Sequence, residues 1–588
     1  MSILRITKKF QSILSSHQKL RIAELAVLMV IGGLLETFSV SLVLPFMNAV
    51  LEPEATMEKW YAKIVCDIFQ LQSPRTFLIV VAILLAGVYI LKNLYLLLEY
   101  NVQYRFVYGN MRAMKSRVLD NYLHRPYEDF LHISTAEILR IIESDVDSTF
   151  IILLSLLGVF TELVVSGMLA LTVFMMARFI TFCMVIMMAV LLLVVSYVIR
   201  PTLHKAGETR QQAGAGVNKW LLQSVQGIKE VKITGKEAYF QENFDTYGGK
   251  LVNAMRKSAI LGMAPRFFIE AFSMSTMFLV VALLIYRGGS LEALIPMLTA
   301  VGVAAIRLLP AVNRIIAGIA SAVSYEPMLD QLIESLSVME GAGGVSLDGT
   351  LRADEEEKKK ADIAPLRSAL DFHEISYHYP DAEENVLTDA SMTVRRGESV
   401  GIVGGSGAGK TTAIDILLGF LRPQKGQVLI DGTDIFADIR GWHEQIGYIP
   451  QMIFMLDDTI RNNVCFGERE EDISDEKLWR ALEEASLADF VRTLPHGLDT
   501  EIGERGIRLS GGQRQRIGIA RALYRDPAVL VFDEATSALD NETEAEIMES
   551  INHLQGQKTM IIIAHRLTTI ENCDRIYRVE DGKISQER

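Results

Sequence analysis

One stretch decides the fold of the C-terminal half of the chain. The apolar run Ser-Val-Gly-Ile-Val at 399–403 leads directly into Gly404-Gly405-Ser406-Gly407-Ala408-Gly409-Lys410-Thr411, and Thr412 follows. This spacing fits G-x-x-x-x-G-K-[ST] between a strand and a helix, where glycines let backbone N–H groups face phosphate oxygens. We predict that this loop and Thr412 bind a nucleotide, that Lys410 reaches its outer phosphates, and that the Thr411 hydroxyl binds Mg²⁺.

A second stretch supplies acidic groups to the same predicted site. The apolar run at 528–532 ends in Asp533 and Glu534. A carboxylate at the end of a strand can hold Mg²⁺ through water, which is the role expected of Asp533. Glu534, one residue further, can act as general base toward an attacking water. Two acids at a strand end would be ordinary by themselves, but beside the phosphate loop they predict nucleotide hydrolysis.

The N-terminal half of the chain has the composition of a membrane domain. Half of all residues are hydrophobic, and the mean hydropathy is +0.25. Six apolar runs are each near or above the ~20 residues that a helix needs to cross the hydrocarbon of a bilayer. These runs occupy 25–47, 77–98, 149–176, 179–199, 260–286 and 291–313.

Loop charges predict the orientation of these six spans. Lysine and arginine concentrate in the long loops between spans 2 and 3 and between spans 4 and 5, so both loops and both termini are expected in the cytosol, with the spans in the cytoplasmic membrane. Each long loop has few helix breakers and is expected to form a helical hairpin, with tips near 125–131 and 235–240. The net charge of −13 argues against nucleic acid as a partner. Four cysteines without paired spacing argue against a zinc site and a disulfide framework.

The first 22 residues contain no acid and leave two interpretations open. One is a mitochondrial presequence, and the other, which we favour, is an amphipathic helix lying on the cytosolic face of the membrane. The expected order is therefore an amphipathic helix at 1–22, a transmembrane domain at 23–335, a linker at 336–369 and a nucleotide-binding domain at 370–588. The fold class is an all-α membrane domain of six helices fused to an α/β P-loop ATPase domain.

The run Leu509-Ser510-Gly511-Gly512-Gln513 resembles the signature motif of the ATP-binding cassette family, and other motifs of that family surround it in order. The resemblance implies ATP and Mg²⁺ as cofactors, and a nucleotide site that includes Ser510, Gly511, Gly512 and Gln513. It implies that Tyr379 stacks on adenine and that Gln451 senses Mg²⁺ and contacts the membrane domain. It also implies that His565 contacts the terminal phosphate. Glu534, His565, Lys410 and Gln451 are thus the expected catalytic set.

The same resemblance implies a dimer. In this family the signature motif of one subunit closes over the phosphate loop of the other, with Ser510 and Gly512 donating to the terminal phosphate and Asp540 in a loop across the interface. This chain has one motif of each kind, so we expect a second copy of itself, and a similar half-transporter remains open. A membrane domain that precedes the cassette resembles exporters of the type IV fold, in which residues such as 500–506 touch the coupling helices.

Charged residues within the spans are candidates for contacting the transported substrate, because each costs about 2.5–3.5 kcal/mol on insertion scales. Arg266 and Glu270 are four residues apart and can pair with each other, and Lys92 can extend toward the cytosolic surface. Arg307 has no carboxylate three or four residues away in the sequence. Its partner is therefore either a residue on another helix, for which Glu36 is a candidate, or a ligand. The full set is Glu36, Lys92, Glu162, Arg266, Glu270, Arg307 and Arg314.

Three stretches, 32–46, 227–237 and 307–314, resemble the branch of exporters that flips lipid-linked oligosaccharides. Flippases of this branch hold a pyrophosphate with basic cavity residues, which implies Lys92, Arg266 and Arg307 as candidates here and an amphiphilic substrate. The alternatives are a lipid, multidrug or peptide exporter. A nucleotide-gated channel is the alternative outside the pump class, and the intact Glu534 argues against it.

Overall fold

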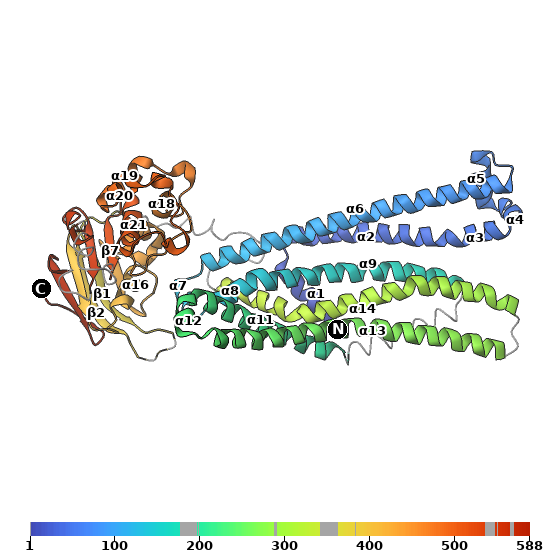
Figure 1. Cartoon of the computed structure of the whole chain (residues 1–588), viewed down its shortest axis with the longest axis horizontal. Coiled ribbons are helices and arrows are strands. Elements are labelled where there is room, and N and C mark those ends of the chain that lie inside the picture. The colour runs from blue at the N-terminus through green and yellow to red at the C-terminus, as the bar shows by residue number, and fades with distance from the viewer. Residues whose placement is uncertain are drawn as a thin grey trace. The chain divides into compact units, whose positions relative to one another are not determined.

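The computed structural model describes residues 2–176, 197, 199–286, 291–341, 363–380, 382, 384–534, 547–549, 551–564 and 570–588. The chain divides into two compact units, which are drawn in Figure 1. The first unit comprises Met1–Arg125 and His132–Ala353. The second comprises Asp354–Arg588 together with the short segment Pro126–Leu131. The tip of the first long loop therefore belongs to the second unit.

The first unit consists of helices, several of them long. Three helices of the described chain are long and apolar enough to cross a membrane: Ser16–Ser39, Pro74–Leu123 and Thr135–Met168. The expected span at 179–199 lies almost entirely outside the described residues. The elements are α1 (Ser2–Ile13), α2 (Ser16–Ser41), α3 (Val43–Leu51), α4 (Pro53–Met57), α5 (Trp60–Phe69), α6 (Pro74–Leu123), α8 (Thr135–Arg140), the π-helical turn η1 (Ile141–Asp145), α9 (Val146–Met176), α11 (Arg200–Gln226), α12 (Ile228–Thr234), α13 (Glu237–Tyr286) and α14 (Leu291–Gly341).

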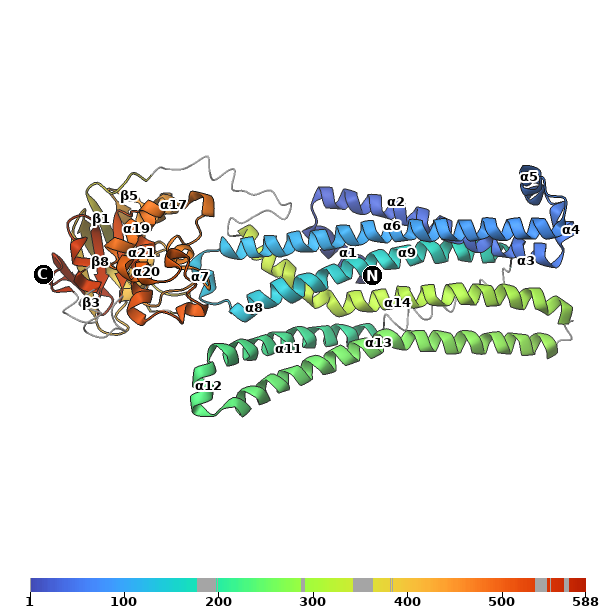
Figure 2. The ribbon, with the colours of Figure 1, turned by 45° about the horizontal axis from the view of Figure 1, so that its top comes forward.

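The second long loop is a helical hairpin. Figure 2 shows α11 and α13 side by side, with α12 closing one end. Gly235 ends α12 with φ +61°, a left-handed conformation that glycine adopts without steric cost. On the other side of α11, Gly207 packs so closely that a Cβ there would lie 2.3 Å from the backbone oxygen of Ser324 in α14. Small residues thus set the separation of these helices.

The N-terminal segment differs from the expectation. We expected one helix over 1–22, but two helices occupy this segment. Ser15 and Gln18 form reciprocal side-chain to backbone hydrogen bonds, which start the second helix. The apolar face of α1 is buried by protein rather than lying on lipid: Phe10 packs edge-on against Phe150. Lys9 on the opposite side lies 2.9 Å from Glu326 of α14. The helix is therefore a packed part of the membrane unit.

The second unit contains two sheets, of which the larger is mainly parallel. The strand order of the six-stranded sheet is β10-β9-β3-β8-β7-β6, and only β10 runs antiparallel to its neighbour. A separate four-stranded antiparallel sheet has the order β2-β1-β4-β5 and was not predicted from the sequence. The strands are β1 (Ala369–Tyr377), β2 (Leu387–Arg395), β3 (Ser399–Gly404), β4 (Lys425–Ile430), β5 (Thr433–Asp434), β6 (Ile446–Ile449), β7 (Val529–Asp533), β8 (Thr559–Ile563), β9 (Arg575–Glu580) and β10 (Lys583–Gln586).

The parallel order follows from the apolar runs. Every residue of β7 and β8 is buried, as is most of β3, which is the pattern of strands covered on both faces. One face of this sheet shares an apolar core with the helices between 460 and 523, since Leu530 and Phe532 of β7 belong to that core. The helices of the second unit are α7 (Tyr127–Phe130), α16 (Lys410–Leu417), η4 (Ile435–Ala437), α17 (Ile439–His443), α18 (Ile460–Val464), η5 (Glu470–Asp472), α19 (Asp475–Glu484), α20 (Ala488–Thr493), η6 (Gly497–Asp499), η7 (Glu504–Gly506) and α21 (Gly511–Tyr524).

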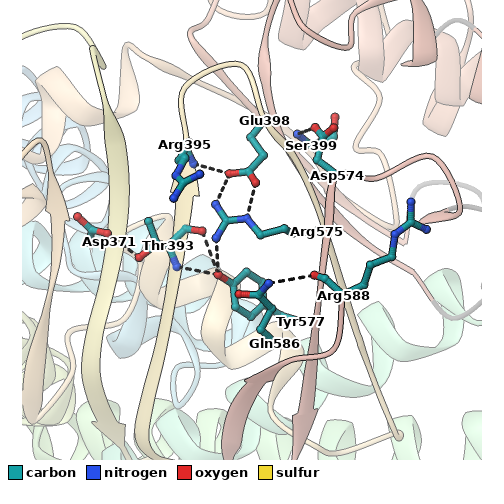
Figure 3. A network of polar contacts seen from close by, with 10 residues as sticks. All are labelled: Asp371, Thr393, Arg395, Glu398, Ser399, Asp574, Arg575, Tyr577, Gln586 and Arg588. Carbon is teal, nitrogen blue, oxygen red and sulfur yellow. Dashed lines mark hydrogen bonds and ion pairs between the residues drawn. The ribbon is translucent and has the colours of Figure 1, made fainter.

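A polar network ties the two sheets together at one edge (Figure 3). Both carboxylate oxygens of Glu398, just before β3, accept hydrogen bonds from the guanidinium of Arg575 in β9. Burial alone would raise the pKa of Glu398, but the bonds from Arg575 and from the backbone N–H of Arg395 hold that pKa below its ordinary value. Arg575 also donates to the Tyr577 hydroxyl, which donates in turn to the backbone oxygen of Thr393 in β2.

We expect Glu398→Ala to lower the melting temperature of the nucleotide-binding unit. The two side chains are only 13% and 16% exposed, and removing one partner of a buried pair costs about 3 kcal/mol or more. This corresponds to roughly 6–12 °C in a unit of this size. Differential scanning calorimetry of the full chain in detergent measures the shift. Glu587→Ala removes the exposed Arg578–Glu587 pair of the same edge and should change little; equal shifts in the two variants would refute the assignment.

Candidate active site

The predicted phosphate loop joins β3 to α16 in the expected way. Lys410 is buried at the start of α16, and its Nζ donates to the backbone oxygens of Gly404 (2.9 Å) and Gly405 (3.0 Å). Gly407 and Gly409 have φ values of +78° and +103°, which side chains with a Cβ rarely tolerate. The loop is therefore curled around the ammonium group.

Space around the loop tests whether it fits a phosphate group. A Cβ at Gly404 would lie 2.3 Å from the backbone oxygen of Val579, so this glycine is held against the neighbouring strand. A Cβ at Gly405 or Gly407 would meet nothing within 4 Å. The loop thus has open space on one side and packs tightly on the other. Backbone N–H groups, a lysine and a helix N-terminus are the donors that a polyphosphate requires.

Two predicted residues contact each other beside the loop. The hydroxyl of Tyr379 lies 3.1 Å from that of Thr412, which is buried in the first turn of α16. Thr411, one position earlier, is exposed and keeps its hydroxyl available for a metal ion. The Thr412 hydroxyl thus has Tyr379 as a side-chain partner, and its part in nucleotide binding stays a prediction.

The acidic residues lie at the carboxyl end of β7, and Asp533 pairs with Ile563 of β8 in the register of the sheet. Asp533 is 9% exposed and accepts a hydrogen bond from the Tyr448 hydroxyl at 3.3 Å. Burial and the neighbouring Glu534 raise the pKa of Asp533. Tyr448 was not among the site residues predicted from the sequence. Its position in β6, beside β7, is what makes it a partner of the carboxylate.

Glu534 and Gln451 are brought together from 83 positions apart in the sequence. Gln451 Nε2 donates to Glu534 Oε2 at 2.7 Å. Glu534 has φ +48°, and its backbone N–H donates to the oxygen of Ile563 at 3.2 Å. A non-glycine residue in the left-handed region is uncommon and concentrates at functional sites. This backbone turn directs the carboxylate of Glu534 away from the strand and toward Gln451.

The signature residues form the N-terminal cap of α21. Ser510 Oγ accepts from the Gln513 backbone N–H (3.2 Å), and Gln513 Oε1 accepts from the Ser510 backbone N–H (2.8 Å), a reciprocal capping box. Ser510 and Gly511 are exposed, so the positive end of this 14-residue helix is open to an anion. Gln513 is one half of this cap, and its contact with the nucleotide stays a prediction. Asp540 and His565 lie outside the described residues.

The second unit also contains the tip of the first long loop, and sequence reasoning did not foresee how it packs there. Its helix α7 places the Tyr127 ring 5.2 Å from the Phe420 ring. Glu128 Oε1 accepts from the Tyr377 hydroxyl at 3.4 Å and from the Arg422 backbone N–H at 3.3 Å. Burial, and then the charge of Glu128, raise the pKa of Tyr377. The Tyr377 ring in turn contacts the ring of Tyr379, which lies beside the phosphate loop. Two aromatic side chains therefore stand between α7 and that loop.

The charged residues of the spans have diverse surroundings. Lys92 is buried, with its Nζ 5.2 Å from the centre of the Tyr89 ring. Arg314 pairs with Glu162 through two hydrogen bonds, the longer at 3.1 Å, so this arginine has a structural partner that the sequence did not reveal. Arg266 is exposed and Glu36 is half-buried, while the side chain of Arg307 lies outside the described residues.

Glu99 was not predicted as an intramembrane charge because it follows the apolar run at 77–98 by one residue. It is only 4% exposed, and its Oε2 has no hydrogen-bond partner in the described part of the chain. A Cβ at Gly32 of α2 would lie 2.2 Å from that oxygen. The glycine therefore makes room for the carboxylate between the two helices.

Comparison with known proteins is consistent with these sites. The family model described as ABC transporter matches residues 387–537, and the model described as ABC transporter transmembrane region matches 24–305. A protein of Methylobacillus flagellatus named ATP-dependent lipid A-core flippase is 33% identical over 388 residues, which are 65% of this chain and 63% of that protein. A protein of the same name from Cupriavidus metallidurans is 30% identical over 82% of this chain and 79% of its own length.

A solved structure extends the likeness to the whole chain. The structure titled as a bacterial Atm1-family ABC exporter with ATP bound superposes with a TM-score of 0.72 and 25% identity, covering 96% of this chain and 94% of the other. The membrane unit, the cassette and the order in which they occur are thus all shared with ABC exporters. The chain belongs to the ABC transporter family.

Proposed function

We propose that this chain is one half of a homodimeric pump that uses ATP and Mg²⁺ to move an anionic amphiphile across the cytoplasmic membrane. The observation that carries this proposal is the convergence of Lys410, Gln451, Asp533 and Glu534 at the carboxyl ends of adjacent parallel strands. Ligands of open α/β sheets bind at such ends. Both termini and the cassette are assigned to the cytosol, from the loop charges.

The residues at this site have three proposed roles: phosphate binding, metal binding and proton transfer. Thr411, Gln451 and Asp533 are the oxygen donors that would hold Mg²⁺, which neutralises charge on the phosphates when it is bound. Lys410 and the backbone N–H groups of the loop orient the outer phosphates. Glu534 would accept the proton of the attacking water, and the hydrogen bond from Gln451 holds its carboxylate in place.

The homodimer is supported by the separation of two half-sites in one chain. The phosphate loop opens beside β3, whereas the capped N-terminus of α21 presents Ser510 and Gly511 to solvent. One chain has one of each, so two composite sites need two chains. ATP that binds between two cassettes adds contacts only in their closed arrangement, and this differential affinity is what drives closure. A similar half-transporter would satisfy the same geometry.

Helix α7 offers a route from the cassette to the membrane helices. It is the tip of the loop that connects α6 to α8, yet Tyr127 and Glu128 pack on the cassette. Met452 and Phe454, just after Gln451, are 86% and 66% exposed and form a second apolar surface of the cassette.

The substrate class rests on resemblance and on charge. The stretches at 32–46, 227–237 and 307–314 resemble flippases of lipid-linked oligosaccharides, and two relatives are named for flipping lipid A-core. Lys92, Arg266 and Arg307 are the proposed basic contacts, and Glu36 would orient one of them. A lipid, multidrug or peptide exporter with a different cargo is the alternative.

Glu534→Gln should abolish steady ATP hydrolysis while ATP binding persists. The amide keeps the shape and the contact region of the carboxylate but cannot take a proton, so a loss of 10²-fold or more in kcat is expected. Lys410→Ala should instead weaken binding itself. Phosphate release and nucleotide binding are measured on the purified full chain. Turnover by Glu534→Gln well above that of Lys410→Ala would contradict the general-base role.

Tyr127→Ala should reduce transport per ATP hydrolysed more than it reduces hydrolysis. The lost aromatic contact with Phe420 is worth about 0.5–1.5 kcal/mol, a two- to tenfold effect. Tyr127→Phe keeps the ring and should behave as wild type. Flipping of a fluorescent glycolipid and ATP hydrolysis are followed in the same vesicles. If both activities fell in parallel in Tyr127→Ala, the coupling role of α7 would be wrong.

ATP hydrolysis in lipid vesicles should rise when a polyprenyl-pyrophosphate oligosaccharide is added, and Arg307→Ala should remove this stimulation. The reason is that a guanidinium matches the oxygens of a pyrophosphate in pairs. Arg307→Lys keeps the charge and should retain part of the effect. Robust basal activity without any response to the glycolipid would leave the pump standing and exclude this substrate.

A further inference from the structure

A basic cavity lies between α11 and α13, outside the ATP site and away from the charged residues of the spans. Its volume is about 430 Å³, within the ~300–1,000 Å³ typical of ligand pockets. The two helices run side by side here, as both views show (Figures 1 and 2). The buried Ala206 and Ala254 form its floor. The polar side chains that line it are Thr202, Lys205, Thr209, Lys250, Asn253 and Lys257.

The three lysines of this cavity are not neutralised by the protein. In the part of the chain that the structure describes, Lys205, Lys250 and Lys257 form no ion pair, and Lys250 only lies 5.2 Å from the centre of the Tyr247 ring. No acidic residue occurs between 246 and 257. The acidic residue of α11 nearest in sequence to Lys205 is Glu208, whose carboxylate lies 3.5 Å from Nδ1 of His204 and does not line the cavity. The lining of the cavity therefore carries three positive charges and no carboxylate.

The cavity extends from the depth of lipid headgroups, at Lys257, toward the aqueous side, at Lys205 and Lys250. Lys257 precedes the apolar run of α13, at 260–286, by three residues, which is ~5 Å at 1.5 Å per residue. Lys205 follows the end of the preceding apolar run, at 199, by six residues, or ~9 Å. The polar zone of a bilayer is about 5–8 Å thick on each side, and lysine side chains extend toward it. Lys250, about 15 Å below the apolar run, would close the cavity from the aqueous side.

We infer that this cavity binds the headgroup of an anionic phospholipid of the cytosolic leaflet. The ammonium groups of Lys205 and Lys257 meet the phosphate, and Lys250 adds positive charge on the aqueous side. The hydroxyls of Thr202 and Thr209 and the amide of Asn253 suit the polar part of the headgroup. The acyl chains would lie along the apolar surface of α13 beyond Lys257. The inference rests on the proposed orientation, with α11 and α13 emerging on the cytosolic side, but not on the identity of the transported substrate.

The test measures lipid binding to the purified full chain by native mass spectrometry. Phosphatidylglycerol, phosphatidylcholine and free glycerol 3-phosphate are the separate probes. Wild type should retain phosphatidylglycerol in preference to phosphatidylcholine. The combined variant Lys205→Gln, Lys250→Gln and Lys257→Gln should bind it about tenfold or more weakly, and the corresponding arginine variant should bind as wild type. A matched control removes three exposed lysines elsewhere: Lys219→Gln, Lys477→Gln and Lys583→Gln.

Each outcome decides the question. Equal binding of phosphatidylglycerol by wild type and the glutamine variant, or equal binding of the two lipids by wild type, would overturn the site. Displacement of the lipid by equimolar glycerol 3-phosphate would show a site for soluble anions instead. ATP hydrolysis in neutral lipid should be unchanged in the glutamine variant, which shows that it is folded. An inactive wild type that still selects phosphatidylglycerol would refute the proposed pump and leave the lipid site intact.

Discussion

Hydrocarbon offers no partner to a backbone N–H or C=O group, and this constraint determines the architecture of the membrane unit. Only continuous helices satisfy every such group within the segment that crosses. Helices α6 and α13 have 50 residues each and α14 has 51, or ~75 Å at 1.5 Å per residue, against the ~30 Å of the hydrocarbon. More than half of each helix therefore lies outside the apolar layer. The elements that cross the membrane are the same rigid bodies that reach into the water beyond it.

The cassette is organised by a different constraint, the parallel sheet. The membrane unit is built from long helices, whereas the ATP site is built at the edge of this sheet. Parallel strands place their carboxyl ends at one edge, so residues near 404, 451 and 533 meet although they are far apart in the sequence. Left-handed backbone conformations complete the site. They occur at Gly409 in the phosphate loop after β3 and at Glu534 directly after β7. Chemistry is thus held by a stiff scaffold. The helical tip α7 packs beside Phe420 on this same scaffold.

What could be predicted from the sequence follows from how local each signal is. The phosphate loop, the acidic strand end and the apolar runs are each specified within a few neighbouring residues, and the sheet and the described spans are where the patterns indicate. Partners set by tertiary packing were not predictable. Tyr448 reaches Asp533 only because β6 lies beside β7, Glu162 reaches Arg314 across 152 positions, and α1 buries Phe10 against Phe150 rather than against lipid. An amphipathic pattern specifies that a face is covered, but not by what.

The charged residues of the membrane unit differ in how they are paired. An isolated ion in an apolar surrounding is costly, and Glu162, which is 12% exposed, is matched by Arg314, one residue past the apolar run at 291–313. At the edge of the apolar layer the cost falls, because a lysine can keep its ammonium group in water. That is where Lys205, Lys250 and Lys257 surround a cavity without a carboxylate. A charge that the protein leaves uncompensated, at the level where anionic headgroups are present in the bilayer, is compensated most readily by the bilayer itself. The membrane then acts as a ligand of this chain as well as its solvent.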